Sequence, residues 1–510
     1  MSLPRIVITG ASGFIGRHLL DAIKERFEIV AMGRRSQRKC GAPIHPNITW
    51  HQVDIGDCRP LTEIFHGIRD SGGADAVVHL AAHYDFTGDE DPEYWRTNVE
   101  GLRNVLELSR GLGLRRFVFA SSLAACQFPA PGQAITESSP PDGEHIYAVT
   151  KRLGEQMLGE FSGDFPSVIV RFAALFSDWC EYAPLFMFLE TWLSRAWNAR
   201  LLAGKGLSAV PYMHVRDASS FLTRVLDRID DLSPGEILSA SPDGAVNHKE
   251  LFEAAALSYS GRRRKPIFLP KIVCRYGLWA RDVTGRLLGD RPFERPWMGR
   301  YIDAALTIDA RRTRQRLGWA PRERLDILRR MPFLIENFKT DPVEWYRRNR
   351  EAMKEVRLRT NLRIHQIVEL HEQQIRDTFT ALLVGSERQT HLPHYEAIPI
   401  EEHQWHHRLI LRHLLNAIRT REKGVFRSYC RDLAERRHAQ GFDVEEVCYA
   451  VASLNQACLK VLREDPESQG LEDAMHDHIT MTIQFGIDEI QEVYEQLHGQ
   501  PPAASAGMPG

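Results

Sequence analysis

The chain has 510 residues, of which 43% are hydrophobic and 26% charged, values typical of a globular protein with two or three domains. Its formal net charge of −2 excludes a global positive field of the kind that attracts nucleic acid or an anionic membrane. The eight cysteines are scattered without a C-x-x-C pair, which argues against a disulfide framework and predicts a cytoplasmic protein.

Short β-branched runs alternate with helical patterns from residue 4 to about 175. The runs predicted as buried strands are Ile6–Ile8, Glu28–Ala31, Ala76–Leu80, Arg116–Phe119 and Ser167–Val170. Because the segments between them can hold crossover helices, we expect an α/β fold with a Rossmann-type doubly wound parallel sheet. The first run begins too early for a signal peptide, and no run of 18 uncharged apolar residues predicts a membrane span. Residues 175–330, rich in aromatic residues and proline, suit a small substrate lobe.

A glycine-rich turn follows the first strand and opens a helix. Its sequence is Thr9-Gly10-Ala11-Ser12-Gly13-Phe14-Ile15-Gly16. The three glycines allow a tight turn, close approach of the backbone to a pyrophosphate, and close packing of the helix on the strand. The helix N-terminus then faces the phosphate charge. This strand–turn–helix context predicts a dinucleotide site.

The end of the second strand carries Arg34 and Arg35, where an acidic residue usually binds the ribose of NAD. Two guanidinium groups suit a 2′-phosphate, so the sequence favours NADP over NAD. The alternative is a pair of solvated loop arginines.

Tyr147 and Lys151 stand one helical turn apart, on the same face of a predicted helix. A free phenol is a poor base at neutral pH, and a neighbouring positive charge favours the phenolate. Ser122, at the end of a predicted strand about 25 residues earlier, can donate to the same substrate oxygen. The three side chains predict acid–base chemistry on a carbonyl or an alcohol.

Six further features stand at fitting positions between residues 4 and about 335. They are Asp54-Ile55-Gly56-Asp57, His79-Leu80-Ala81-Ala82, Asn98 in Thr97–Gly101, Ser121-Ser122, Met213–Asp217, and Ile308-Asp309 with Leu317–Pro321. With the glycine loop and the Tyr–Lys pair, this segment resembles the extended short-chain dehydrogenase/reductase family, of the NAD-dependent epimerase/dehydratase type.

The resemblance implies an enzyme and a role for each matching residue. Asp54 and Ile55 would border the adenine, and Leu80, Ala81 and Ala82 would lie along the cofactor. Tyr147 would be the acid/base, Lys151 would bind the nicotinamide ribose, and Ser122 would orient the carbonyl. Asn98 is expected to pack a helix and is left out of the catalytic set.

Two departures from the family pattern bear on the substrate. Members that act on nucleotide sugars usually have an aromatic–glycine pair after the serine strand, where this chain has Cys126-Gln127. They also have an asparagine near the diphosphate, where this chain has Ala174. Both departures argue against a nucleotide sugar as the substrate. The following aromatic residues are expected to be mostly core, with an apolar-substrate pocket as the alternative: Phe176, Trp179, Tyr182, Phe186, Phe188, Trp192 and Trp197.

The C-terminal part has a different character. A charged connector, residues 341–355, is predicted to join the domain 1–340 to a helical bundle at 356–498, with a disordered tail at 499–510. About five helices are expected, one with an apolar face made by Trp405, Leu409, Leu411, Leu415 and Ile418. Gly441 is predicted as the C′ residue of one helix, and Asp443 with Glu446 as a capping box opening the next.

The run from Arg431 to Val447 is similar to the helical sensor domain of stressosome co-antagonist (RsbR-type) proteins. This resemblance implies a globin-like or bundled module, often without haem, that senses a signal or dimerises. Residues 350–498 hold 12 of the 21 histidines, among them His403, His406, His407 and His413. Without a paired Glu-x-x-His signature they are expected to be surface residues, and no metal site is predicted.

The leading hypothesis is an NAD(P)-dependent oxidoreductase acting on a small, apolar carbonyl or alcohol substrate. The alternatives are an epimerase or dehydratase that transfers hydride transiently, and an NAD(P)-binding sensor whose output passes to a signalling partner through residues 356–498. A homodimer is expected, with no nucleic acid partner. The segment from Ile267 to Trp279 could touch a membrane surface, although basic residues are few there.

Overall fold

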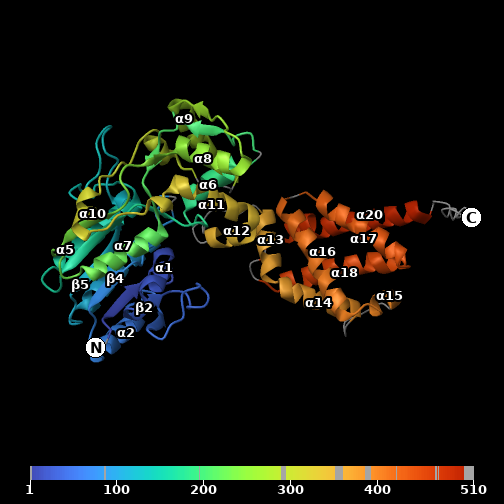
Figure 1. Cartoon of the computed structure of the whole chain (residues 1–510), viewed down its shortest axis with the longest axis horizontal. Helices are drawn as coiled ribbons and strands as arrows, with labels where there is room; N and C mark the ends of the chain where they lie inside the picture. The colour runs from blue at the N-terminus through green and yellow to red at the C-terminus, as the bar shows by residue number, and fades with distance from the viewer. Residues whose placement is uncertain are drawn as a thin grey trace, which may run out of the picture. The chain divides into compact units, whose positions relative to one another are not determined.

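The computed structural model describes residues 3–498 except 86–87, 195, 289–293, 351–359, 385–391, 421, 466–467 and 469. The chain forms two compact units, Met1–Val356 and Arg357–Gly510, which we describe separately (Figure 1). Among the described helices, none has the length and apolar character needed to cross a bilayer. The predicted tail, residues 499–510, lies outside the described part.

The first unit is built on a seven-stranded parallel sheet in the order β11-β6-β5-β4-β1-β2-β3. Its strands are β1 (Arg5–Thr9), β2 (Glu28–Gly33), β3 (Ile48–Gln52), β4 (Ala76–His79), β5 (Arg116–Ser122), β6 (Ser167–Phe172) and β11 (Glu236–Ala240). The predicted doubly wound parallel sheet is confirmed, and all five predicted strands are present.

Alternate residues of each strand point to opposite faces of the sheet, and both faces are covered by helices. Ile6 and Ile8 pack with α1 (Phe14–Ile23) and α7 (Val215–Asp227). Val7, between them, packs on the other face, whose helices are α2 (Cys58–Asp70), α4 (Gly101–Ser109) and α5 (Ile146–Glu160). Burial on both faces explains why the strand sequences are continuously apolar.

The strand order reverses between β1 and β4, which lie side by side at the middle of the sheet. Connections from their carboxyl ends depart in opposite directions at such a point and leave a crevice between them. Thr9 ends β1 and His79 ends β4, and the two side chains meet through Thr9 Oγ1 and His79 Nδ1 at 3.0 Å. The predicted glycine loop therefore begins at the edge of this crevice.

A smaller lobe follows, built from short strand pairs and helices. Its elements include β7 (Ala174–Phe176) with β10 (Tyr212–His214), β8 (Leu201–Ala203) with β13 (Ile267–Leu269), β9 (Ala209–Val210) with β12 (Val246–Asn247), and the helices α6 (Ala183–Trp192), α8 (His248–Ser260), α9 (Lys271–Leu288) and α11 (Ile327–Thr340). Of the predicted core aromatics, Phe176, Phe186 and Trp192 are buried, whereas Trp197 is exposed.

Much of the predicted connector belongs to the first unit. Residues Pro342–Arg350 form helix α12, whose Trp345 is fully buried with Phe186 in the core of the small lobe. Asn349, also buried, accepts from the Glu181 backbone N–H at 2.8 Å and donates to the Trp179 carbonyl at 2.8 Å. The charged side chains of this segment lie on the outer face of a packed helix. From composition alone, such a helix could not be distinguished from a charged linker. The rest of the connector lies outside the described residues.

The described part of the second unit is helical and contains no strand, as predicted. Its helices are α13 (Thr360–Leu370), α14 (Glu372–Val384), α15 (Pro393–Glu396), α16 (Ile400–Thr420), α17 (Gly424–Ala439), α18 (Val444–Arg463), α19 (Glu472–Met475), the π-helix η7 (His476–Thr480) and α20 (Met481–His498). One apolar core joins them. Leu411, Leu415 and Ile418 face it as predicted, but Trp405 is 54% exposed, so the predicted face was wrong there.

The start of α18 differs from the prediction. Gly441 has φ +84° and follows α17, as expected of a C′ glycine. Asp443 caps α18 by accepting from the Glu445 N–H at 2.8 Å. Glu446 does not complete a capping box, because its carboxylate binds His394 Nδ1 at 2.6 Å. A tertiary hydrogen bond thus replaces the local hydrogen bond of a capping box.

Candidate functional site

The glycine loop lies against the end of β4. Gly10 has φ +70°, and a Cβ on it would lie 2.5 Å from the Ala81 backbone nitrogen. A Cβ on Gly16 would lie 2.5 Å from the Gly10 carbonyl oxygen. Both glycines are therefore required by backbone packing. The Leu80 N–H donates to the Thr9 carbonyl at 3.1 Å, so the predicted cofactor residues after β4 border the loop.

The N-terminus of α1 opens directly from this loop. Gly13 is its N-cap and makes no side-chain cap, and its N–H donates to the Gly10 carbonyl at 2.9 Å. Phe14 and Ile15 begin the helix, so their N–H groups belong to the first turn, which has no intrahelical acceptors. Ser12 Oγ lies against Gly33 at the end of β2. The arrangement offers backbone donors and the positive end of the helix dipole to an anion.

The two predicted arginines occupy different surroundings. Arg35 donates to the Ser12 carbonyl, so its guanidinium lies across the glycine loop, where burial and then Arg17 lower its pKa. Arg34 points to Glu93, with Arg34 Nη1 3.6 Å from Glu93 Oε2. Arg35 therefore lies on the glycine loop, whereas Arg34 has an acidic partner of its own.

The predicted adenine-side residues follow β3. Asp54 Oδ1 accepts from the Gly56 N–H at 2.9 Å, and Asp54 Oδ2 pairs with Arg96 at 3.0 Å. Ile55 is buried against Gly101, where a Cβ would lie 2.8 Å from Ile55 Cγ1. These contacts fix the loop that follows β3 to the helix carrying Asn98.

Ser122 and Tyr147 meet at the carboxyl end of β5. Ser122 ends the strand, and Tyr147 lies in the first turn of α5. Burial raises the pKa of Tyr147, and a hydrogen bond with Ser122 opposes that rise. We expected Lys151 to lower this pKa, but burial of the half-exposed Tyr147 side chain against its neighbours dominates. The two side chains predicted to act on the substrate oxygen therefore lie within hydrogen-bonding distance of each other.

Lys151 lies one turn further along α5 and is almost fully buried. Its Nζ donates to the Ala120 carbonyl at 2.7 Å and lies 5.5 Å from the Tyr147 ring centroid. Burial lowers the pKa of Lys151 to about 8, and Glu155 opposes this shift. The cation therefore lies beside the phenol ring, although burial and Ser122 are what shift the pKa of Tyr147.

Aromatic side chains that the sequence analysis did not single out surround Tyr147. Tyr84 stacks on it with ring centroids 4.1 Å apart, and His145 lies 6.3 Å away. Trp297 stacks on the other side of His145 at 6.1 Å. Tyr182, which the sequence analysis did name, is half-buried, and its phenol helps to raise the pKa of Tyr84. No local pattern marks Tyr84 or Trp297, since they come from a loop and from the distant 3₁₀ helix η3 (Pro296–Tyr301).

Two buried polar networks hold this site in place. The Asn98 amide accepts from the His83 N–H at 2.6 Å and donates to the His83 carbonyl at 3.0 Å and to Thr150 Oγ1 at 3.1 Å. It therefore ties the loop carrying Tyr84 to α5, which agrees with the predicted packing role.

The second network lies behind Ser122. Ser121 Oγ donates to Glu155 Oε1 at 2.6 Å, and Arg171 pairs with the same carboxylate at 2.7 Å. Arg171 also donates to the Ser139 carbonyl at 2.7 Å. The arginine that precedes Ala174 in the sequence is thus engaged inside the protein, between β6 and α5.

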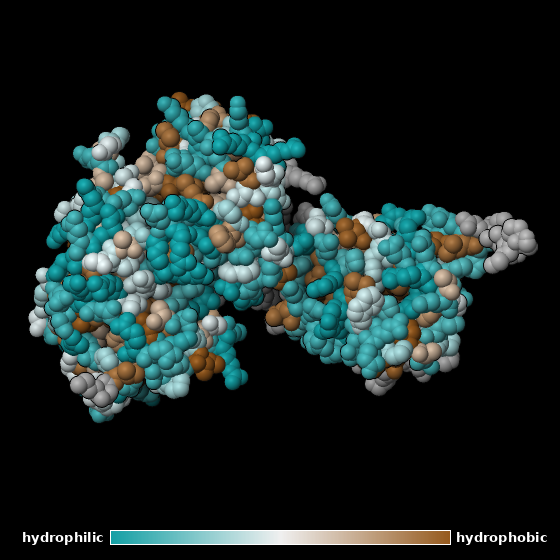
Figure 2. Space-filling view, viewed as in Figure 1, coloured by the Kyte–Doolittle hydropathy of each residue, from teal (hydrophilic) through white to brown (hydrophobic). Residues whose placement is uncertain are grey.

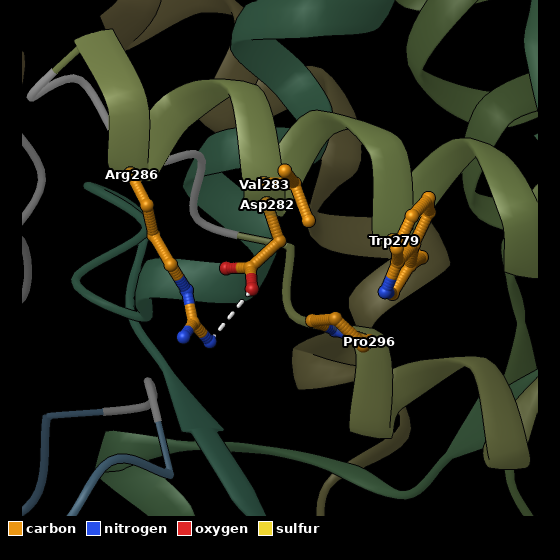
Figure 3. Close-up of a pocket in the computed structure, with 5 residues that line it drawn as sticks. All are labelled: Trp279, Asp282, Val283, Arg286 and Pro296. Carbon is orange, nitrogen blue, oxygen red and sulfur yellow. Dashed lines mark ion pairs between the residues drawn. The ribbon is translucent and has the colours of Figure 1, made fainter.

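A cavity of about 340 Å³ lies between α9 and η3 (Figure 3). Trp279, Val283 and Pro296 line it, together with Asp282 and Arg286, which form an ion pair at 2.8 Å. Its lining includes neither the aromatic side chains around Tyr147 nor the glycine loop.

Comparison with known proteins agrees with this geometry. Residues 6–240 match the model of the NAD dependent epimerase/dehydratase family. Over these residues the first unit is similar to that family. The match spans the whole seven-stranded sheet, the glycine loop, Ser122 and the Tyr147–Lys151 pair.

Several curated relatives are enzymes of this type. An L-arabinose 1-dehydrogenase (NAD(P)(+)) of Haloferax volcanii is 30% identical over 174 residues, which are 32% of this chain and 62% of that protein. A putative dihydroflavonol 4-reductase of Synechocystis is 30% identical over 132 residues, 26% of this chain and 36% of that protein. A dTDP-glucose 4,6-dehydratase of Mycobacterium tuberculosis is 25% identical over 235 residues, 44% of this chain and 69% of that protein. The chain thus spans from about a third to about two thirds of these relatives.

Solved structures share the fold. UDP-glucose 4-epimerase of Thermotoga maritima, solved with UDP-glucose, superposes with a TM-score of 0.51 at 19% identity, covering 66% of this chain and 98% of that one. UDP-glucose 4-epimerase of Thermus thermophilus, solved with NAD, gives a TM-score of 0.50 at 19% identity. The superposition covers 66% of this chain and 99% of that one.

The lowered pKa of Lys151 predicts a pH-dependent stability. The unfolded lysine keeps its proton up to about pH 10.5, whereas the folded one releases it near pH 8. The unfolding free energy of the wild type, relative to Lys151→Met, is therefore flat below about pH 8 and rises between pH 8 and 10.5. The rise is about 3 kcal/mol, at about 1.4 kcal/mol per pH unit. Urea denaturation followed by circular dichroism at several pH values measures it, and a constant difference would contradict the burial of a charged Nζ.

Proposed function

We propose that the first unit is an NAD(P)-dependent oxidoreductase that interconverts a carbonyl compound and its alcohol. The observation that carries this proposal is the hydrogen bond between Ser122 and Tyr147, with Lys151 one helical turn away. These side chains lie at the carboxyl edge of the same sheet that carries the glycine loop. The family match and the dehydrogenases and reductases among the relatives support it.

The residues around the crevice fit a dinucleotide. Backbone packing excludes side chains at Gly10 and Gly16, and the first turn of α1 offers N–H groups to the pyrophosphate. Asp54 and Ile55 would border the adenine, and Leu80, Ala81 and Ala82 would lie along the middle of the cofactor. When bound, the nicotinamide supplies or accepts the hydride.

The chain's own side chains handle the proton and the substrate oxygen. Ser122 donates to the oxygen and orients it, and Tyr147 gives it a proton on reduction or takes one on oxidation. Lys151 supplies positive charge near the phenol, which offsets part of the effect of burial. The stacked ring of Tyr84 helps to exclude water from one side of Tyr147.

An apolar substrate fits the surroundings better than a nucleotide sugar. Tyr84 and His145 lie against the Tyr147 ring, and Trp297 stacks on His145. Arg171 is neutralised by Glu155 inside the protein, so it does not reach out to a diphosphate.

An epimerase or dehydratase activity is the second candidate, favoured by the dehydratase among the relatives. Such an enzyme returns the hydride, so the absorbance of reduced nicotinamide stays constant during turnover. The third candidate is an NAD(P)-binding sensor with output through residues 356–498, the segment that resembles the RsbR-type sensor domain. Homodimer formation and a cytoplasmic location stay predictions.

Replacing Tyr147 and Gly13 separates chemistry from binding. With a panel of aromatic and aliphatic ketones as substrates, Tyr147→Phe lowers kcat by about 10² to 10⁴, because the acid/base is removed, and leaves dinucleotide binding unchanged. Gly13→Asp abolishes dinucleotide binding, since a carboxylate would meet the pyrophosphate at the helix N-terminus. Absorbance of reduced nicotinamide measures turnover, and fluorescence titration measures binding. Tyr276→Phe, on the exposed face of α9, is the control. Undiminished turnover in Tyr147→Phe would exclude the proposed role.

Arg35→Ala tests the cofactor preference. Because Arg35 lies across the glycine loop, its removal weakens NADP binding by about tenfold or more and affects NAD binding little. Arg34→Ala has the smaller effect, since Arg34 is paired with Glu93. Equal weakening of NADP and NAD in Arg35→Ala would contradict recognition of a 2′-phosphate.

A further inference from the structure

The second unit contains a small internal cavity that the proposed chemistry of the first unit does not use. Its volume is about 30 Å³, space for a few atoms. Five helices supply its walls, α14 to α18. The lining side chains are Phe379, Leu383, Tyr395, His403, His406, His407, Ile410, Tyr429, Leu433, Arg437, Ala450 and Val451.

Arg437 brings a full positive charge to this cavity. It is only 3% exposed, and its Nε is buried without a hydrogen-bond partner. Nη1 donates to the neutral amide of Gln440 at 2.8 Å, and the guanidinium lies over the rings of Tyr395 and Phe442 at 5.4 and 4.6 Å. Within the described residues no carboxylate forms an ion pair with it. A guanidinium stays charged at all working pH values, so this charge is buried without a counter-ion.

The histidines in the cavity are neutral donors and acceptors. His403 and His407 are buried, contrary to the expectation of surface histidines, because α16 turns them toward the core. Burial, and then the neighbouring histidines, lower the pKa of His407 to about 3. His403 Nε2 lies 2.8 Å from the Tyr395 carbonyl, and His407 Nδ1 lies 3.0 Å from Thr380 Oγ1. His406 Nδ1 is buried and has no partner.

The positive charge of Arg437 determines which charge a ligand of this cavity carries. Three histidines suggest a metal cation, but Arg437 in the same cavity would repel one. A negative charge would instead neutralise Arg437 and accept from its Nε–H. His406 Nε2 lies 3.4 Å from Glu402 Oε1, so the neutral ring donates to that carboxylate and Arg437 is the donor left for the ligand.

We infer that this cavity binds a small anion, a carboxylate or oxyanion of a few atoms, held by Arg437. Its size excludes phosphate esters and nucleotides. The anion would neutralise the buried charge of α17 inside the core shared by five helices, so its binding would stabilise the helical unit that we predicted as a sensor. The inference stands whether or not the first unit is an oxidoreductase.

Thermal unfolding of the full chain in sodium formate, acetate and nitrate tests the inference, with ionic strength kept constant by sodium gluconate, which is too large for the cavity. The wild-type midpoint should rise and saturate with at least one of the three anions, since a ligand of the folded state stabilises it. Isothermal titration then gives the affinity.

Arg437→Met keeps the aliphatic stem and removes the unpaired charge, so it should fold, as circular dichroism would verify. This substitution should weaken binding of the anion by about tenfold or more. Arg436→Met, an exposed neighbour on α17, is the matched control and should keep the wild-type affinity. A wild-type midpoint indifferent to all three anions, or an equal response in Arg437→Met, would overturn the inference.

A separate observation concerns the surface of the first unit. Six large apolar side chains on β13 and α9 are 44% to 72% exposed: Ile267, Phe268, Ile272, Val273, Tyr276 and Trp279. We call these six residues the α9 face. Figure 2 shows apolar atoms at the surface in this part of the molecule. Contiguous exposed apolar residues of this size mark an interaction site.

The α9 face has the make-up of a membrane-interface helix. Ile272, Tyr276 and Trp279 recur at four and three along one side of α9, whereas Asp282 is turned inward and paired with Arg286. Tyrosine and tryptophan are the residues that settle at the lipid–water boundary. The exposed run Arg262-Arg263-Arg264-Lys265 precedes β13, and Lys271, Arg275 and Arg281 lie on α9 itself.

Lys271 and Arg281 are each paired with a carboxylate at 3.6 Å, of Asp303 and Glu294 respectively. The positive charge beside the α9 face therefore rests mainly on the run Arg262-Arg263-Arg264-Lys265 and on Arg275. We propose that the α9 face docks on an anionic lipid surface. Apolar side chains would enter the interface while the basic residues meet the headgroups. Trp279 and Val283 also line the 340 Å³ cavity, so that cavity would open beside the lipid.

Co-sedimentation of the full chain with vesicles tests this docking. Vesicles of phosphatidylcholine with 30% phosphatidylserine should bind the protein, and neutral phosphatidylcholine vesicles should bind it at least tenfold more weakly. Tyr276→Ser with Trp279→Ser should reduce binding by about tenfold or more. Trp405→Ser, which removes an exposed tryptophan of the second unit, is the control.

Sedimentation velocity without lipid separates docking on a bilayer from pairing with a second copy. Conversion of a dimer to a monomer by the double variant, without a change in vesicle binding, would overturn the proposal. Equal binding of wild type and double variant to anionic vesicles would also overturn it. Neither readout depends on catalytic turnover.

Discussion

The close contact between the glycine loop and the end of β4 is the constraint on which the first unit depends. Gly10 adopts a left-handed conformation and leaves no room for a Cβ beside Ala81. This contact brings the β1–α1 turn to the point where the strand order reverses, so the N-terminus of α1 and the loop after β4 border one crevice. A dinucleotide placed there would run past the ends of β4 and β5, toward Ser122 and Tyr147.

Buried polar networks then set the geometry of the reacting side chains. Asn98 ties the loop of Tyr84 to α5, and Glu155 joins Ser121 to Arg171 behind Ser122. Each network satisfies polar groups that have lost contact with water, so removing one partner leaves another unpaired. Buried hydrogen bonds thus hold the candidate site at the sheet, and aromatic side chains from a loop and from η3 lie beside it.

Local patterns were sufficient to predict the sheet, the glycine loop and the Ser122–Tyr147–Lys151 set, because each depends on residues close in sequence. They failed where tertiary contacts compete with local ones. The charges of residues 341–350 suggested a linker, yet Trp345 anchors a packed helix. Glu446 suited a capping box but pairs with His394. Likewise, no periodicity could reveal that Tyr84 stacks on Tyr147 or that Arg437 is buried without a carboxylate, since both depend on chain segments that meet only in the fold.

The central claim is that the crevice at Gly10 holds a pyridine dinucleotide beside Tyr147. The most direct measurement is to purify the full chain without added ligand, denature it, and identify the released small molecules by mass spectrometry, followed by equilibrium dialysis of the emptied protein with NADP and NAD. Our account predicts release or uptake of one dinucleotide per chain. A protein that carries no dinucleotide and takes up neither NADP nor NAD in dialysis would contradict it.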